Sequence, residues 1–527
     1  MKRCPQCRRD YYDESLLYCL DDGAVLLSGP GASAGLEPTI AFTTLNGPFE
    51  SKTMIYGGAV DTPNANTIAV LPFLNLSSEE DSSYFSDGLA EELLNVLSKI
   101  KGLRVAARTS AFSFKDKSTT ISEIGQILQV ASVLEGSVRK AGQRVRISVQ
   151  LVKVVDGYQL WSETYNRTMD DIFSVQDDIA QSVVEEIRVR LLGEKSGETV
   201  IRQVESEVAS AVKGRSDDPE AQRLFMLGRH FLDRTTRDDT TKAIEYFTQA
   251  LEIDPEFALC WAELARARSI EAGRDWIDST RGFELSREAV NKALAVEPDL
   301  AEGHAQLGRI KAAHDWDLSG AESSYKRALE LAPGSSSVLD GASILYYKLG
   351  RLDEAISLGE QVLEQDPLSA AYWHNLGLTC HAAGRFDESE KAFRRALELA
   401  PQRFVTHALL SLVLLDKDDR AGALEEAQNE TDQFWRLWAL TIIHWLNGER
   451  ATAGEMLKEI VDRHSRANAY QISEIYAVCG ENDKAFEWLA RAVDEHDTGV
   501  THAKVNPRLR PLHADPRWPG LLASIGF

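Results

Sequence analysis

Five prolines recur between residues 255 and 401 at nearly constant spacing. They are Pro255, Pro298, Pro333, Pro367 and Pro401, and the last three intervals are 35, 34 and 34 residues. Proline ends an α-helix because it lacks the backbone N–H and its ring clashes with the preceding turn. A period of about 34 residues therefore predicts stacked helical hairpins, each ended by a proline. Because such hairpins build one continuous core, the period fixes the fold expected for residues 215–510.

Residues within each interval follow one motif. The interval ending at Pro401 carries Trp373, Leu376, Gly377, Ser389, Phe393 and Ala396. Two earlier intervals hold the same small and aromatic pair, Gly228 with Phe247 and Gly308 with Tyr325. A small residue is expected where two helices cross closely. The pattern resembles the tetratricopeptide repeat (TPR), which implies an all-α superhelix of about 7–8 repeats whose concave groove binds a protein or peptide partner. Residues 511–527 are expected to form a capping helix.

The charge balance limits the partners of the chain. Lys and Arg total 58 against 81 for Asp and Glu, a formal net charge of −23. Such a chain is repelled by phosphate backbones and anionic lipid unless a local basic patch overrides the net charge. No apolar run reaches the roughly 18 residues of a membrane span. We therefore expect a cytoplasmic protein with no membrane insertion and no nucleic-acid partner; its self-association is not predicted.

Four N-terminal residues have the spacing of a metal site. Cys4 and Cys7 form a C-x2-C knuckle, and Cys19 with Asp22 forms a second half-site. Tetrahedral zinc accepts thiolate and carboxylate ligands, so this set predicts a structural Zn²⁺ within residues 1–25. The segment resembles the short zinc ribbons that open many bacterial multidomain proteins, with Asp22 where Cys is usual. The alternative is a knuckle that binds no metal.

A linker and an α/β domain come next. Residues 26–65 are rich in Gly, Ser, Pro and Thr and predict a flexible linker. Residues 66–193 alternate between strand and helix patterns, with hairpin turns at Ala141-Gly142 and Asp156-Gly157. The expected strands are 67–73, 103–107, 133–140, 144–154 and 158–167, and the expected helices are 85–100, 122–128 and 172–192. This order predicts a mixed sheet covered by helices.

Five sequence segments of this domain are similar to those of one family. They are Ile68-Ala-Val-Leu-Pro-Phe, Tyr84-Phe-Ser-Asp-Gly-Leu-Ala-Glu-Glu-Leu, Ala107-Arg-Thr-Ser, Leu134-Glu-Gly-Ser-Val-Arg and Leu160-Trp-Ser-Glu-Thr-Tyr. These segments resemble the bacterial TolB N-terminal-like (FlgO-like) domain, which is commonly fused to TPR arrays. The resemblance implies no agreed catalytic residues. The kinase, cyclase and winged-helix domains that accompany it in relatives have no counterpart in this sequence.

The whole chain is thus expected to be multidomain: a zinc ribbon, a mixed-sheet α/β domain and a TPR solenoid. Residues 194–214 would connect the last two, and 66–193 and 215–527 would each fold alone because the segments between them can bury little. Alternatively, helix 172–192 and the stretch to Lys213 dock on the first repeat.

Polar residues of the α/β domain could in principle support chemistry. They are Asp87, Glu91, Glu92, Arg108 and Glu135, which are expected to be helix caps, solvated side chains and salt bridges. No P-loop, zinc-protease motif or dinucleotide fingerprint occurs. We therefore expect a non-enzymatic scaffold or sensor adaptor. The alternatives are a small-molecule or nucleotide sensor or an enzyme in the α/β domain and, less favoured, a DNA-binding regulator acting through the zinc ribbon.

Three arginines mark the expected groove. Arg229, Arg266 and Arg309 each follow the small residue of the first helix of a repeat. Stacking would place them in a basic row that suits carboxylates of an acidic peptide through bidentate hydrogen bonds. The alternative is that each arginine pairs with a neighbouring acid such as Glu263 or Glu302.

Overall fold

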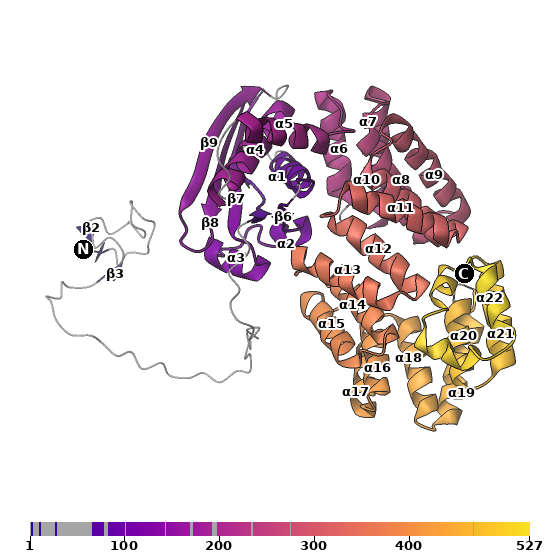
Figure 1. The fold of residues 1–527 in the computed structure, drawn as a ribbon. Helices are drawn as coiled ribbons and strands as arrows, with labels where there is room; N and C mark the ends of the chain where they lie inside the picture. The colour runs from indigo at the N-terminus through magenta and orange to yellow at the C-terminus, as the bar shows by residue number, and fades with distance from the viewer. Residues whose placement is uncertain are drawn as a thin grey trace. The chain divides into compact units, whose positions relative to one another are not determined.

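The computed structural model describes residues 66–527, apart from 78–82, 101, 143, 169–171, 192–197, 233–235, 275 and 467, and six residues nearer the N-terminus. Those six form three short strands, β1 Lys2–Arg3, β2 Asp10–Tyr11 and β3 Leu27–Ser28, paired in the order β2-β1-β3. The chain divides into two compact units, Met1–Asp61 and Thr62–Phe527. The second unit contains the larger sheet and the described helices (Figure 1).

The larger sheet is mixed, as predicted. Its strands are β4 Thr67–Val70, β5 Leu74–Asn75, β6 Arg104–Val105, β7 Ser132–Ala141, β8 Arg144–Lys153 and β9 Gln159–Thr168. The order is β6-β4-β7-β8-β9, with β5 also paired to β7. Strand β4 runs parallel to β6 and β7, whereas β7, β8 and β9 are antiparallel. The strand predicted over 67–73 is shorter because Pro72, which has no N–H to donate to a ladder, follows β4.

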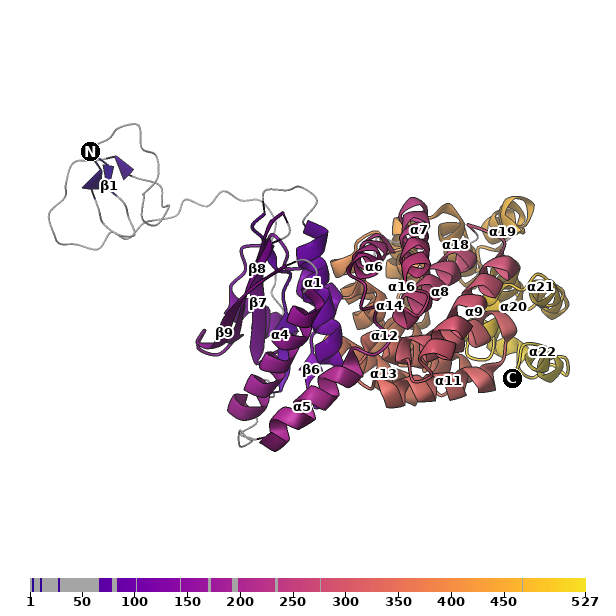
Figure 2. The ribbon, with the colours of Figure 1, turned by 90° about the horizontal axis from the view of Figure 1, so that it is seen from above.

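The main helical layer lies on the side of this sheet that faces the repeats. It contains α1 Ser83–Ser98, α4 Ile172–Glu186 with the π-helical turn Ile187–Leu191, and α5 Glu198–Ala211. Figure 2 shows α1 and α4 between the sheet and the repeats. Leu89, Leu93 and Leu97 of α1 pack with Leu134 and Ile147 of the strands in one buried core. Helix α5 occupies the segment predicted to connect the domains.

Two shorter helices complete the domain. They are α2 Arg108–Phe112 and α3 Ile121–Leu128. Ile124 and Leu128 of α3 share a second buried cluster with Ala69 and Val133. Because successive residues of a strand point to opposite faces, this cluster lies on the face opposite that of Ile68 and Leu134. Sequence patterns predicted α3 but did not anticipate α2.

In the described part of the chain, eight helical hairpins follow. They pair α6 Pro219–Leu232 with α7 Arg237–Ile253, α8 Ala258–Gly273 with α9 Ser279–Val296, α10 Ala301–Ile310 with α11 Leu318–Leu331, α12 Ser336–Leu349 with α13 Leu352–Gln365, α14 Ala370–Ala382 with α15 Phe386–Leu399, α16 Thr406–Asp416 with α17 Arg420–Asn429, α18 Gln433–Leu446 with α19 Arg450–His464, and α20 Ala469–Val478 with α21 Asn482–Asp494. The first helix of each hairpin contacts the first helix of the next. These first helices, here called the inner helices, therefore form one continuous side of the array.

The small residues of the repeat lie where the motif predicts. A Cβ placed on Gly228 would approach the Phe247 ring to 2.4 Å, and one placed on Gly377 would approach Phe393 to 2.8 Å. A side chain at either position would force the two helices of the hairpin apart. Aromatic bulk on the second helix therefore requires glycine on the first, which is why the two residue types recur together.

A ring nitrogen contacts the closing proline at four of the five predicted hairpin ends. The contacts are Trp261 Nε1 to the Pro255 carbonyl (2.9 Å), His304 Nε2 to Pro298 (2.8 Å), Trp373 Nε1 to Pro367 (2.9 Å) and His407 Nε2 to Pro401 (3.0 Å). Each ring lies six residues after its proline. The contact joins the end of one hairpin to the inner helix of the next, and so fixes the step between repeats.

The C-terminal segment seals the last hairpin and turns back onto the inner helices. It comprises the 3-10 turns η5 Thr498–His502 and η6 Pro507–Leu512 and the helix α22 Trp518–Ser524. Trp518 packs with Leu489 of α21, and α22 is shorter than the capping helix expected over 511–527. Arg508 pairs with Asp416 of α16, and Arg510 donates to the Ala382 carbonyl of α14 at 3.0 Å.

Among the described residues, no helix combines the length and the apolar character that a membrane crossing requires.

A buried acid at this closure gives a pH-dependent prediction. Glu474 on α20 is 4% exposed and accepts a hydrogen bond from Asn506. Burial raises the pKa of Glu474 from 4.5 to about 8. The folded state therefore keeps the proton that the unfolded chain releases. The resulting stability is fully present below pH 4.5 and is lost as the pH rises to about 8.

Replacing the acid by its neutral isostere should remove this loss. Calorimetry of Glu474→Gln should show an unfolding midpoint about 2–5 °C above wild type at pH 8, and little difference near pH 4.5. The predicted pH dependence would be contradicted if the unfolding midpoints of Glu474→Gln and wild type differed by the same amount at both pH values. Glu481→Gln, at an exposed position just before α21, is the matched control and should behave as wild type.

Candidate functional site

The three predicted groove arginines occupy equivalent places on successive inner helices. Arg229 lies on α6, Arg266 on α8 and Arg309 on α10. Helix α6 contacts α8, and α8 contacts α10. The row predicted from the sequence is thus formed by neighbouring helices, but its three members have different surroundings.

Arg229 is occupied by two carboxylates of the α/β domain. Its Nη1 lies 2.9 Å from Glu92 Oε1, and its Nη2 pairs with Glu91 Oε1. Both acids are on α1, which packs against α6. The sequence analysis looked for acidic neighbours within the repeats, such as Glu263 and Glu302, whereas this pair comes from another domain.

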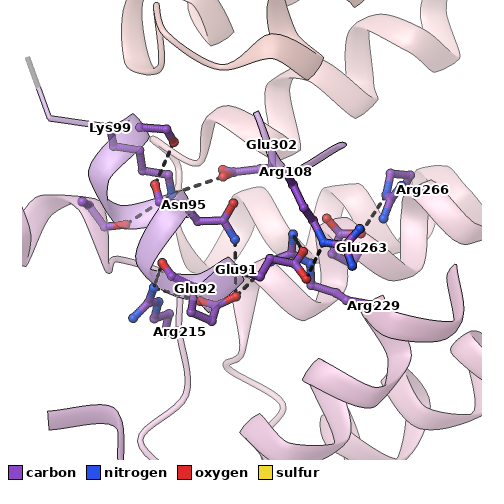
Figure 3. A network of polar contacts seen from close by, with 12 residues as sticks. Glu91, Glu92, Asn95, Lys99, Arg108, Arg215, Arg229, Glu263, Arg266 and Glu302 are labelled. Atoms are coloured by element: carbon purple, nitrogen blue, oxygen red, sulfur yellow. Dashed lines mark hydrogen bonds and ion pairs between the residues drawn. The ribbon is translucent and has the colours of Figure 1, made fainter. Parts of the chain in front are cut away.

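Two further arginines complete this contact. Arg108 Nε lies 2.9 Å from Glu91 Oε2, and Arg215 Nη2 lies 2.8 Å from Glu92 Oε2 (Figure 3). Glu91 is 5% exposed and Glu92 is 3% exposed. Buried carboxylates require paired, hydrogen-bonding cations, and here guanidinium groups from α2, α6 and the α5–α6 connection supply them. We call these five residues the α1 clamp.

Apolar contact accompanies the clamp. Met226 of α6 belongs to the same buried core as the sheet and α1. A Cβ on Gly88 would lie 2.3 Å from the Met226 Cε, so α1 approaches α6 at a residue without a side chain. Val204 and Val208 of α5 join this core. The core of the α/β domain therefore reaches the first hairpin through Met226, whereas the other buried apolar residues of that hairpin belong to a separate core with α8 and α9.

A second contact joins α2 to the loop that ends the fourth hairpin. Ser110 Oγ donates to Asp366 Oδ1 at 2.5 Å and accepts from the Leu368 N–H at 2.9 Å. The Ala107 N–H donates to the Gln365 carbonyl at 2.8 Å. Burial raises the pKa of Asp366 despite its hydrogen bonds.

Lys99, directly after α1, makes a third contact with the array. Its ammonium lies 3.1 Å from Glu302 Oε1 on α10. The contacts of α1, α2 and the residues beside them thus reach the first, third and fourth hairpins.

The sequence analysis did not anticipate this interface. It offered docking of the segment up to Lys213 only as an alternative to separate domains, and the docking surface extends well beyond that segment. Independent folding of 66–193 and 215–527 stays a prediction. The sequence contains no signal for it: residues 85–94 of α1 are all buried in the structure, whereas Glu91 and Glu92 have the sequence appearance of solvated helix residues.

The other polar residues singled out in the α/β domain make local contacts. Lys115 pairs with Asp87 at 2.6 Å, and Gln150 donates to Glu135. Both interactions fit the structural roles expected from the sequence.

The remaining arginines of the row differ from Arg229. Arg266 pairs with Glu263 on its own helix at 2.7 Å, which is the alternative that the sequence left open. Arg309 is exposed and makes no ion pair with the residues that the structure describes.

The α/β domain carries a cleft of about 770 Å³. Its apolar lining includes Leu71, Phe73 and Phe114, and its polar lining includes Glu135 and Gln150. The cleft begins where the chain leaves β4, beside the strand β7 that runs parallel to it. Crevices at the carboxyl ends of parallel strands commonly hold ligands.

The predicted zinc ligands Cys4, Cys7, Cys19 and Asp22 lie outside the described residues, so the zinc site stays a prediction. Within the described part of the chain, no group of three or more His, Cys, Asp or Glu side chains is arranged to hold a metal ion.

Family models match three parts of the chain. Two tetratricopeptide repeat models match residues 236–257 and 341–404, which confirms the repeat prediction. A model described as the second domain of HilA/YgeH-like transcriptional regulators matches residues 64–182. The TolB-like resemblance is not among these matches and stays a prediction.

Individual relatives are similar over part of the chain. "Putative adenylate cyclase 3" of Rhizobium meliloti (strain 1021) is 35% identical over 270 residues, which are 51% of this chain and 41% of that protein. "Tetratricopeptide repeat protein 37" of Xenopus laevis is 24% identical over 276 residues, 50% of this chain and 16% of its own length. The chain thus spans less than half the length of these curated relatives.

Two solved structures match part of the chain at low identity. The structure of Pseudomonas aeruginosa pilF is 18% identical, and the match covers 42% of this chain and 96% of that one, with a TM-score of 0.33. A tetratricopeptide repeat protein of Parabacteroides merdae is 14% identical over 51% of this chain and 100% of its own, with a TM-score of 0.36.

Removing one cation from the α1 clamp should destabilise the protein. Arg229→Glu places a third carboxylate beside Glu91 and Glu92, and breaking a buried ion pair costs about 3–5 kcal/mol. We expect a lower unfolding midpoint and faster proteolysis between the α/β domain and the first hairpin. Arg281→Glu, on a 57% exposed side chain of α9, is the control and should change stability by less than about 0.5 kcal/mol. Equal behaviour of the two variants would show that the clamp contributes nothing to stability.

Proposed function

We propose that this chain is a non-enzymatic interaction scaffold or signalling adaptor, in which the inner helices of the TPR array hold a protein or peptide partner. TPR arrays generally bind proteins. The observation that supports the proposal most directly is the α1 clamp, because an inner helix of this array already holds an acidic helix of the same chain through Arg229. The position is thus suited to receive a polypeptide through its side chains.

The structural roles of the polar residues support a scaffold over an enzyme. Glu91, Glu92 and Arg108 are engaged in ion pairs that join domains, and Asp87 is paired with Lys115. The α/β domain would then act as a fixed part of the scaffold, held at the first hairpin by the α1 clamp and the packing of Met226. The cyclase name of one relative applies to that protein, of which this chain spans 41%.

Capture of partners by matched variants tests the proposal. Tagged full-length protein, an inner variant with Arg266→Glu and Arg309→Glu, and an outer variant with Arg281→Glu and Arg395→Glu would each be incubated with lysate and analysed by quantitative mass spectrometry. We expect at least one protein to be retained by wild type and the outer variant but depleted more than about tenfold by the inner variant. That protein, once purified, should bind the full chain with the same dependence. Arg229 is left unchanged because it belongs to the α1 clamp.

The scaffold function would be wrong if the inner and outer variants captured the same proteins in equal amounts. Circular dichroism and the unfolding midpoint of each variant must match wild type, since a misfolded array would also lose its partners.

A second candidate function, sensing of a small molecule by the α/β domain, is supported by its cleft. Ser137, Ser148 and Gln150 of β7 and β8 line the cleft together with Phe73 and Phe114, so it offers both hydrogen bonds and apolar contact. Small-molecule sites commonly combine these two features.

Thermal shift against nucleotides and common metabolites would test this second function. A ligand at 100 times its Kd should stabilise the protein by about 2.7 kcal/mol. Ser137→Phe, which places a ring in the cleft, should abolish the shift, whereas Asn166→Phe, at an exposed position of β9 outside the cleft lining, should retain it. No shift with any compound, or equal shifts in both variants, would count against sensing at this cleft.

A further inference from the structure

Three basic side chains gather on the inner side of the third to fifth hairpins. Arg309 lies on α10, Lys348 on α12, and Arg403 in the connection between α15 and α16. None of the three makes an ion pair with a residue that the structure describes. We call them the inner basic patch.

Arg309 and Lys348 lie on the inner helices α10 and α12, which contact each other, and Arg309 and Arg403 act on one common carboxyl. Burial and then the charge of Arg309 lower the pKa of Lys348 to about 8. Arg309 and Arg403 both act on the carboxyl of Asp340, whose pKa burial raises to about 6. Asp340 is held by Asn375, whose Nδ2 donates to Asp340 Oδ1 at 2.9 Å. One carboxylate, already hydrogen-bonded to an amide, therefore stands near two guanidinium groups without pairing with either.

The patch differs from many other cations of the array, which have a visible partner. Several arginines pair with acids, for example Arg351 with Glu322 at 2.6 Å and Arg395 with Glu398 at 2.7 Å. Others lie over an aromatic ring, as Arg450 does over Trp445. The chain as a whole has 81 acidic residues against 58 Lys and Arg, so acidic partners are abundant. Burying a cation without a partner is unfavourable. The patch is therefore a place where the folded chain leaves positive charge unsatisfied.

One donor atom of the patch is unsatisfied as well. Arg403 is partly buried, and its Nε, a hydrogen-bond donor, has no partner among the described residues. Arg309 itself is exposed. A ligand that reached Arg309 and Arg403 could accept hydrogen bonds from both guanidinium groups. Lys348, only 8% exposed, would add its charge without direct contact.

The α1 clamp shows which ligand chemistry this type of position accepts. Arg229 precedes Arg266 and Arg309 in the same row and holds the side chains of two consecutive glutamates. The match of a guanidinium fork to a carboxylate is bidentate and specific. From the patch and this precedent, we propose that Arg309, Lys348 and Arg403 form a binding site for an acidic peptide segment of the partner. The inference rests on the proposed scaffold function and specifies the chemistry of its ligand.

Fluorescence anisotropy with a defined probe tests the site. Fluorescein-labelled hexaglutamate would be titrated with the full-length protein at low salt (about 50 mM) and high salt (about 300 mM), and its affinity should fall at high salt because exposed charges are screened. Hexalysine and a single-stranded hexauridylate RNA serve as comparison probes. We expect hexaglutamate to bind at least about tenfold more tightly than hexalysine, since like charges disfavour the wrong partner.

Variants locate the binding. Arg309→Ala, at an exposed position, should weaken hexaglutamate binding about tenfold by removing one charge-assisted contact. Arg309→Ala combined with Arg403→Gln should weaken it further. Arg281→Ala on α9 is the control and should bind as wild type. Circular dichroism verifies that each variant is folded, and the Arg309 single variant keeps the test valid if the double variant is not.

The site assignment would be overturned if Arg309→Ala and Arg281→Ala bound hexaglutamate equally, or if hexaglutamate bound no better than hexalysine. Tighter binding of hexauridylate, lost on Arg309→Ala, would also overturn it and assign the patch to nucleic acid. If lysate capture still depended on the inner face, only the ligand chemistry would be wrong. If capture did not depend on it, the scaffold function itself would fail.

Discussion

Two buried carboxylates on α1 govern how the α/β domain and the repeats are joined. Glu91 and Glu92 have almost no exposure to water, and removing an ionised carboxylate from water is unfavourable unless cations replace the lost hydration. Arg108 comes from the α/β domain itself, but Arg215 and Arg229 come from the start of the repeat array. Neither the α/β domain nor the repeat array alone supplies all the charged groups that these ion pairs need. The ion pairs thus specify which surfaces meet, while the packing of Met226 of α6 against Gly88 and the core of the α/β domain supplies apolar burial.

The regular step of the array gives chemically identical positions different roles. Arg229, Arg266 and Arg309 occupy the same place in successive inner helices, yet one is bound by α1, one by Glu263 of its own helix, and one is exposed. A solenoid allows this because each hairpin contacts mainly its neighbours, so local substitutions do not disturb the common backbone. Function can therefore vary along the array while the fold remains constant.

The repeats were predictable from the sequence because their determinants are local, whereas the site was only partly so. Gly377 and Phe393 lie within one hairpin, and the ring of Trp373 reaches a carbonyl of the preceding loop. The partners of Arg229 instead lie more than a hundred residues away, on a helix that no periodicity connects to the array. Glu91 and Glu92 have the sequence appearance of solvated helix residues, and only the packing of α6 over α1 buries them. Of the inner basic patch only Arg309 was predicted, because the absence of an ion pair at the patch depends on three hairpins at once.

The ends of the array explain why its middle is the place for a ligand. A terminal hairpin exposes an apolar face that must be covered, because stacked repeats bury their surfaces only against neighbours. At the first hairpin, α5 and α1 provide this cover. At the last, Trp518 packs on Leu489, and Arg508 ties the C-terminal segment to α16. At both ends, residues of the inner helices therefore serve to stabilise the fold. Of the arginine row, Arg309 lies between the two covers and makes no ion pair within the described part of the chain, so its guanidinium group can serve recognition rather than folding.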